Sequence, residues 1–177
     1  MTPRTSSAAW VRGITDMMAA EGLPAAELCA EAGIDLAALQ LPQTRVDVDK
    51  ISRLWELAVA RSGKVALGLC PQLTARYGNV DVVGYALASG PNLLVGFQHL
   101  TRHMAVISDC TTFALDHDAR GYWISIAHIG ATRPIPRQRV EYALLTLFTL
   151  CCWLTRRELR PLAVELTTPQ PAATGEA

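Results

Sequence analysis

The stretch from Ala66 to Asp109, ALGLCPQLTARYGNVDVVGYALASGPNLLVGFQHLTRHMAVISD, carries the clearest signals of fold in this chain. A Gly-Leu pair at 68–69 is typical of a helix end, and Gly-Tyr-Ala-Leu at 84–87 is typical of a helix start. A Ser-Gly-Pro-Asn sequence at 89–92 follows. Because glycine and proline at such positions mark turns, the stretch predicts one helix over 81–88, a break, and a second helix after it.

The second helix is expected over residues 92–107. Leu93, Phe97, Leu100 and Met104 follow one another at intervals of four, three and four residues. This spacing places them on one side of an α-helix, so the helix should bury that side.

The first 75 residues are predicted to form a cluster of short helices. Serine and aspartate stand where helices should begin, and glycine stands where they should end. The expected helices are one capped by Ser6 or Ser7 and ended by Gly22; one over 25–32 with Pro24 at its start and Gly33 at its end; a short one from Asp35 to Leu39; one opened by Asp47 or Asp49 and closed at 62–63; and one over 65–73.

After the long helix the pattern changes to that of β-strands. Residues 111–116 and 122–129 are rich in β-branched and aromatic residues, and His-Asp-Ala-Arg-Gly at 117–121 is a turn sequence. We therefore expect an antiparallel hairpin. Its second strand would place Ile124, Ile126 and His128 on one side, and Trp123 and Ser125 on the other.

A further helix is predicted over residues 137–158, apolar nearly all round, followed by a short strand over 162–166 that could join the hairpin. The fold class is then α+β, with a helical N-terminal half and long helices packed on a small antiparallel sheet. The expected organisation is one domain over 8–168, comprising a helical cluster at 8–75 and a helix/hairpin/helix/strand part at 76–168, with a loose tail at 169–177.

Composition excludes several classes of function. The 16 basic and 16 acidic residues cancel, which argues against independent binding to nucleic-acid phosphates. The segment AAELCAEAGID at 25–35 is similar to the start of a helix-turn-helix, but its acidic residues have the wrong sign for DNA.

The five cysteines form no CxxC pair and suggest buried thiols. With no signal peptide and no apolar run of membrane-spanning length, we expect a cytoplasmic protein without membrane contact.

The ordered series of elements resembles the N-terminal effector-sensing domain, of the arabinose-binding type, of AraC-type bacterial transcription regulators. The resemblance covers about residues 8–168 and rests on the Gly-Leu at 68–69, the Gly-Tyr-Ala-Leu at 84–87, the long helix ending at Ser108-Asp109, the hairpin, and Pro-Leu-Ala-Val-Glu-Leu at 161–166. It implies a small organic effector as partner. In relatives a helix-turn-helix domain follows, so DNA binding is expected only through a C-terminal domain outside these 177 residues.

A ligand pocket is expected where the long helix meets the hairpin, because apolar surroundings with a few polar groups are typical of small-molecule sites. From the hairpin, Ser125 or His128 could supply a polar group to this pocket. The predicted ligand-binding residues are Tyr77, Tyr85, His99, Arg102, His103 and Trp123. An arginine such as Arg102 would suit a carboxylate effector.

The sequence contains few residue patterns that are typical of an enzyme active site. His99 and His103 share a helix face, but no glutamate completes an HExxH motif, and no GxSxG nucleophile sequence occurs. We expect no enzyme, no metal and no cofactor. The favoured hypothesis is an effector-sensing regulatory domain; the alternatives are a ligand-free dimerisation or interaction module and, third, a haem or metal sensor or enzyme. Self-association as a homodimer is compatible with the first two.

Overall fold

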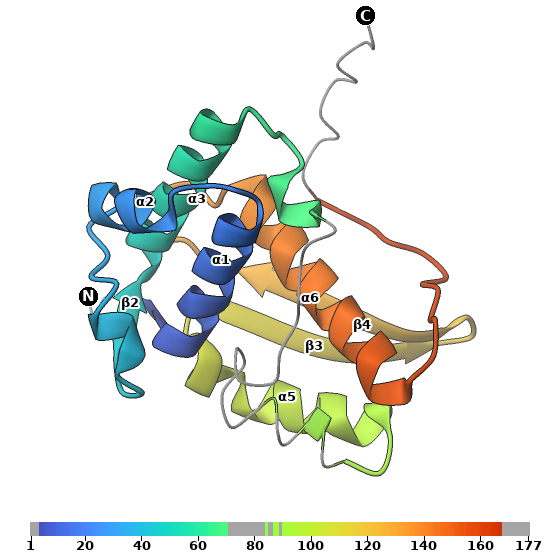
Figure 1. The fold of residues 1–177 in the computed structure, drawn as a ribbon. Helices are drawn as coiled ribbons and strands as arrows, with labels where there is room; N and C mark the ends of the chain where they lie inside the picture. The colour runs from blue at the N-terminus through green and yellow to red at the C-terminus, as the bar shows by residue number, and fades with distance from the viewer. Residues whose placement is uncertain (1–3, 71–83, 85–86, 89, 168–177) are drawn as a thin grey trace, which may run out of the picture.

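The computed structural model describes residues 4–70, 84, 87–88 and 90–167, and within this part the fold is α+β (Figure 1). It contains five α-helices and two antiparallel two-stranded sheets. The α-helices are α1 (Ala8–Ala20), α2 (Ala25–Glu31), α3 (Val48–Ser62), α5 (Leu93–Ile107) and α6 (Arg137–Thr155), with the 3-10 helices η1 (Ala38–Gln40) and η2 (Leu67–Leu69) between them. The strands are β1 (Thr5–Ser7), β2 (Arg45–Asp47), β3 (Thr111–Asp118) and β4 (Gly121–His128).

Side-chain caps begin three of the helices, and two of these caps, Ser7 and Asp47, are among the residues predicted from the sequence to open helices. The side chain of Ser7 accepts the backbone N–H of Trp10 at the start of α1, and Asp47 and Asn92 cap α3 and α5 in the same way. These side chains satisfy backbone donors that have no partner inside the helix. Gly63, with φ of 67°, closes α3 in the left-handed conformation that glycine adopts without strain.

The N-terminal half buries one apolar core. The inner sides of α1, α2 and α3 supply it, with Trp55, Ile14 and Met18 among its fully buried side chains. Charged pairs hold the outside of this half: Arg61 of α3 contacts both Glu27 and Glu31 of α2. Residues 25–35 are therefore a packing helix and its connection, consistent with rejection of a DNA-reading role.

A second core lies between α5, α6 and the hairpin of β3 and β4. In Figure 1, α6 runs in front of the hairpin and α5 lies below it. The hairpin pairs Thr111 with His128 and Asp118 with Gly121, so two residues form the turn. Phe97 of α5 stacks on Phe113 of β3 with ring centroids 6.0 Å apart, and Leu150 of α6 belongs to the same core.

Several features differ from the sequence predictions. Within the described residues, the short helices expected over 35–39 and 65–73 are 3-10 turns of three residues, Ala38–Gln40 and Leu67–Leu69. The hairpin turn, expected over 117–121, has two residues because Asp118 and Gly121 already pair. The pairing of β1 with β2 was not predicted, because three-residue strands 40 positions apart leave no periodic signal. The strand predicted at 162–166 is wrong: this segment has no regular secondary structure and pairs with no strand among the described residues, and Leu162 is 86% exposed. Leu162 instead approaches Gly121 at the hairpin turn, so the segment passes the end of the hairpin. The last long helix ends at Thr155, three residues before the predicted end.

Candidate functional site

A pocket of about 60 Å³ lies where α1, α5, the hairpin and α6 meet. Its apolar walls follow from helical spacing, because residues three or four apart lie on one side of a helix. These wall residues are Leu100, Met104 and Ile107 from α5 and Ala143, Leu147 and Leu150 from α6. Phe113 of β3 and Ile126 of β4 close the hairpin side, and Trp10 closes the side of α1.

The polar lining of the pocket consists of Ser108, Thr111, His128 and Thr146. The first three form a hydrogen-bonded chain. The Thr111 hydroxyl lies 3.2 Å from Ser108 Oγ and 3.0 Å from His128 Nδ1. Ser108 Oγ in turn lies 2.9 Å from Ser6 Oγ. One end of an otherwise apolar pocket therefore carries orientable hydrogen-bonding groups.

His128 is an uncharged imidazole at neutral pH. Burial disfavours its protonated form, and the nearby Arg139 charge adds to this, so the pKa of His128 falls to about 4. Its Nε2 atom is buried and has no hydrogen-bond partner among the described residues. A buried polar atom without a partner is costly in a folded protein. The ring thus offers one unused hydrogen-bonding position beside the pocket.

Arg139 of α6 is a buried cation directly behind this polar end. Only 2% of the residue is exposed. Its Nη2 donates to Cys110 Sγ at 3.2 Å, its Nη1 donates to Ser52 Oγ at 3.4 Å, and its Nε has no partner among the described residues. Cys110 Sγ lies 2.8 Å from Ser108 Oγ, which connects the guanidinium to the pocket lining. No carboxylate of the described residues forms an ion pair with Arg139, since the buried Glu141 pairs with Arg137 instead.

An aromatic contact series connects the pocket with the N-terminal core. The Trp10 ring, which lines the pocket, lies 5.3 Å from the Tyr142 ring, and the Tyr142 ring lies 5.5 Å from that of Trp55. Trp10 packs against both cores. Burial of the Tyr142 phenol raises its pKa well above the usual range, so it stays neutral. A movement of the pocket walls can therefore reach α1 and α3 through packed rings.

Comparison with protein families identifies the chain. Residues 22–177 match the family model described as the arabinose-binding domain of AraC transcription regulators, at their N-terminus. The chain belongs to this family. A search of curated protein sequences gave no significant match. As an AraC-type arabinose-binding domain, the protein is a ligand-sensing regulatory domain, which agrees with the predicted resemblance.

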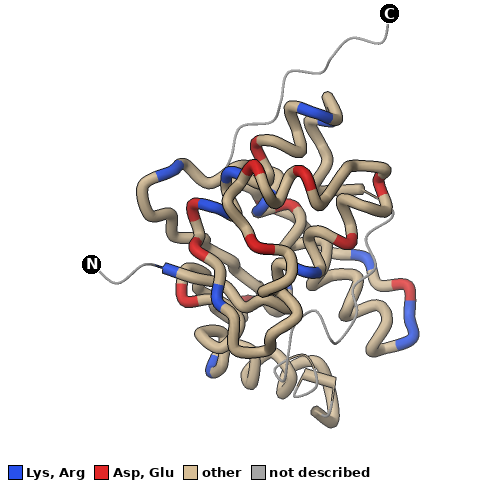
Figure 2. Tube along the Cα trace, turned by 60° about the vertical axis from the view of Figure 1, so that its left-hand side comes forward, with Lys and Arg blue, Asp and Glu red and all other residues tan. Residues whose placement is uncertain are grey.

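The charges of this AraC-type domain are mixed in sign. Figure 2 shows lysine and arginine interspersed with aspartate and glutamate along the trace. In the part of the chain that the structure describes, no helix has the length and apolarity needed to cross a bilayer. No cluster of three metal-binding side chains occurs in the same part, and His99 and His103 have no third ligand there.

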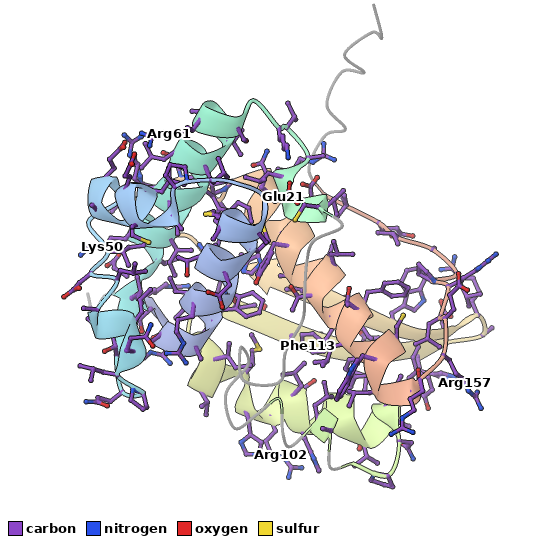
Figure 3. All side chains as sticks on the ribbon, in the orientation of Figure 1. Glu21, Lys50, Arg61, Arg102, Phe113 and Arg157 are labelled. Carbon is purple, nitrogen blue, oxygen red and sulfur yellow. The ribbon has the colours of Figure 1, made fainter. Side chains whose placement is uncertain are left out.

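The predicted ligand-binding residues of this domain lie in different places. Tyr77 and Tyr85 are outside the described residues. His99 is half-buried on α5, whereas Arg102 and His103 are exposed, and Figure 3 shows Arg102 on the side of α5 that faces away from the hairpin. Trp123 is half-buried and donates from Nε1 to Asp118 Oδ2 at 2.8 Å. None of the four described residues is among those that line the pocket.

His128, considered for the hairpin, does line the pocket, on the same side of β4 as Ile126. The sequence interpretation missed Ser108, Thr111 and Arg139. A signal for Arg139 was present: together with Tyr142, Thr146 and Leu150 it follows intervals of three, four and four, which place it on the buried stripe of α6.

Proposed function

We propose that this domain binds a small organic effector in the pocket between α5, α6, the hairpin and α1, and that binding controls an AraC-type transcription regulator. The observation that supports this most is a pocket with apolar walls and a polar end at the junction of the two cores. A concave, mostly apolar site with a few polar groups is the usual form of a small-molecule site.

The regulatory step is a shift between two arrangements of the domain. The pocket has a volume of about 60 Å³, whereas an engineered protein cavity of about 150 Å³ accommodates one benzene molecule. An effector as large as benzene therefore has to displace the walls, and the displacement favours an expanded arrangement. The effector can shift the equilibrium only as far as it binds that arrangement more tightly. The rings of Trp10, Tyr142 and Trp55 provide the contact path to the N-terminal helices.

The role of these 177 residues is then sensing. Among the described residues, basic and acidic side chains are mixed along the trace, and the pairing of Glu27 and Glu31 with Arg61 leaves α2 without a basic surface for phosphate contacts. DNA recognition belongs in this proposal to another part of the regulator. Tyr77, Tyr85, His99, Arg102, His103 and Trp123 stay predictions as ligand contacts; alanine substitution of each, measured beside substitution of His128, separates a site on the α5 surface from the pocket.

A cavity-filling variant tests the proposal. Ala143→Leu adds three carbon atoms inside the pocket, and Ala60→Leu makes the same change at an exposed position of α3. We expect native mass spectrometry and thermal shift across a metabolite panel to detect ligand binding in the wild type and in Ala60→Leu. Ala143→Leu should lose it while keeping its circular dichroism spectrum. Equal binding by all three proteins, or no binding by the wild type, contradicts the proposal.

A second candidate function is an interaction module that works without a ligand. Leu162, Val164 and Leu166 are 86%, 65% and 38% exposed, and adjacent exposed apolar residues often mark an interface. This candidate predicts a dimer that Leu162→Glu dissociates, measured by sedimentation equilibrium. If the wild type stays monomeric over a 100-fold range of protein concentration, this candidate is excluded.

A further inference from the structure

The charge of Arg139 has no counterion within the described protein, and this indicates what the effector brings. Buried charges in folded proteins are usually paired with an opposite charge, because removal from water costs several kilocalories per mole. The acceptors found here are a serine hydroxyl at 3.4 Å and a cysteine sulfur at 3.2 Å, and neither belongs to a carboxylate. The Nε donor has no acceptor at all among the described residues.

This unpaired charge lies at one end of the pocket only. From Arg139 the contacts run through Cys110 Sγ to Ser108 Oγ, and Ser108 lines the pocket. Arg139 also lies near enough to His128, another lining residue, to depress its pKa. A positive potential therefore reaches the polar end, and in a low-dielectric interior it attracts an anion more strongly than in water. Apart from the Thr146 hydroxyl and the Trp10 indole, the other lining side chains are apolar, and none of the lining residues is a carboxylate.

The side chains at the polar end can form hydrogen bonds with a carboxylate while His128 stays uncharged. The Thr111 hydroxyl lies within hydrogen-bond distance of both Ser108 Oγ and His128 Nδ1. In the structure the Thr111 hydroxyl donates to Ser108 Oγ, so it accepts from Nδ1–H and leaves Nε2 as an acceptor without a partner. Rotation of this hydroxyl towards Nδ1 moves the imidazole proton to Nε2, where Nε2–H becomes a donor suited to an anionic oxygen.

We propose that the effector is a small monocarboxylate with a short apolar body, whose carboxylate lies at the polar end near His128, in the field of Arg139. One unpaired cation calls for a single negative charge. Scaled from the benzene cavity, 60 Å³ accommodates about two to three carbon atoms before the walls move. A sugar fits poorly, because its hydroxyl groups would meet mainly aliphatic and aromatic side chains and remain without partners. This inference rests on the proposed function and names the ligand class of the same pocket.

Matched pairs of probes test the charge requirement. Propionate, isobutyrate and isovalerate are compared with propionamide, isobutyramide and isovaleramide, which have the same shape without the charge, and with L-arabinose. Saturation-transfer NMR and thermal shift at constant ionic strength measure binding to the intact chain. We expect each acid to bind at least about tenfold more tightly than its amide, and L-arabinose to give no response.

Variants assign the preference to Arg139. Arg139→Gln should remove the preference for the acid, and Arg139→Lys should keep part of it. The control Arg157→Gln makes the same charge change at an exposed position after α6, seen at the right of Figure 3, and should keep all of it. If Arg139→Gln does not fold, the acid–amide comparison on the wild type decides alone.

The outcomes separate the two proposals. Equal binding of acids and amides, or binding of L-arabinose alone, overturns the carboxylate inference and leaves pocket sensing in place. An acid preference that persists in Arg139→Gln overturns the role of Arg139. If neither acids, amides nor sugar bind, the carboxylate inference is overturned, and the metabolite-panel measurement on Ala143→Leu and Ala60→Leu decides the fate of pocket sensing.

Discussion

Replacing Arg139 with methionine should make the ligand-free protein more stable. The methionine side chain follows the aliphatic part of the arginine as far as Nε, and it removes a buried cation that has no carboxylate partner among the described residues. The effective penalty for burying an ion is several kcal/mol. Against this, the lost contacts to Ser52 and Cys110 contribute about 1 kcal/mol each, and Ser52 Oγ loses its donor at a cost of about 1 kcal/mol or more.

The balance is a gain of about 1 to 3 kcal/mol in the free energy of unfolding. For a chain of this size, 1 kcal/mol shifts Tm by about 2 to 4 °C, so Arg139→Met should melt about 2 to 12 °C higher. Urea unfolding followed by circular dichroism gives the free energy, and calorimetry gives Tm. Arg157→Met, at an exposed position, should change the free energy by less than about 0.5 kcal/mol. A lower Tm for Arg139→Met would refute the argument, because it would show that the guanidinium is already compensated in the empty protein.

Three further predictions concern the fold around the pocket. Gly68→Ala places a Cβ 2.2 Å from the backbone oxygen of Gln138, so η2 or α6 must move and stability should fall by about 2 kcal/mol in urea unfolding. The pKa of His128 is about 4 in the folded protein against 6.5 for the free side chain. Because the unfolded chain binds the proton first, the free energy of unfolding should decline by about 3 kcal/mol as pH falls from 6.5 towards 4, and His128→Phe should flatten this dependence. Asp47→Ala removes the cap that accepts the Asp49 N–H and should cost about 1 kcal/mol, whereas an unchanged midpoint would contradict the capping role.

The elements that could be predicted from the sequence are those with local signals. Ser7, Asp47 and Asn92 cap helices through hydrogen bonds to residues two or three positions ahead, so the sequence contains both partners. The hairpin was predicted because a turn sequence and β-branched strands are also local features, although the turn was placed over 117–121 and the structure narrows it to two residues. The pairing of Thr5 with Asp47 brings together distant residues and has no such signal.

The pocket depends on packing between distant elements, which a single sequence does not specify. Periodicity identified Leu100 and Met104 as the buried side of α5, and these residues do line the pocket. It could not indicate that the polar lining would come from Ser108 and Thr111 rather than from the histidines of the same helix. Arg139 was missed although it follows the buried periodicity of α6, because an arginine near a helix start is normally expected at the surface.

The most direct test of the account is methyl NMR of the chain labelled at isoleucine and leucine, during a titration with isobutyrate. The pocket methyls of Leu100, Ile107 and Leu147 should shift, and those of Leu28 and Leu39 in the core of the N-terminal half should shift less. Isobutyramide should produce the same pattern only at much higher concentration. Shifts confined to exposed residues of α5, or no shift at any methyl group with either probe, would contradict an effector site in this pocket.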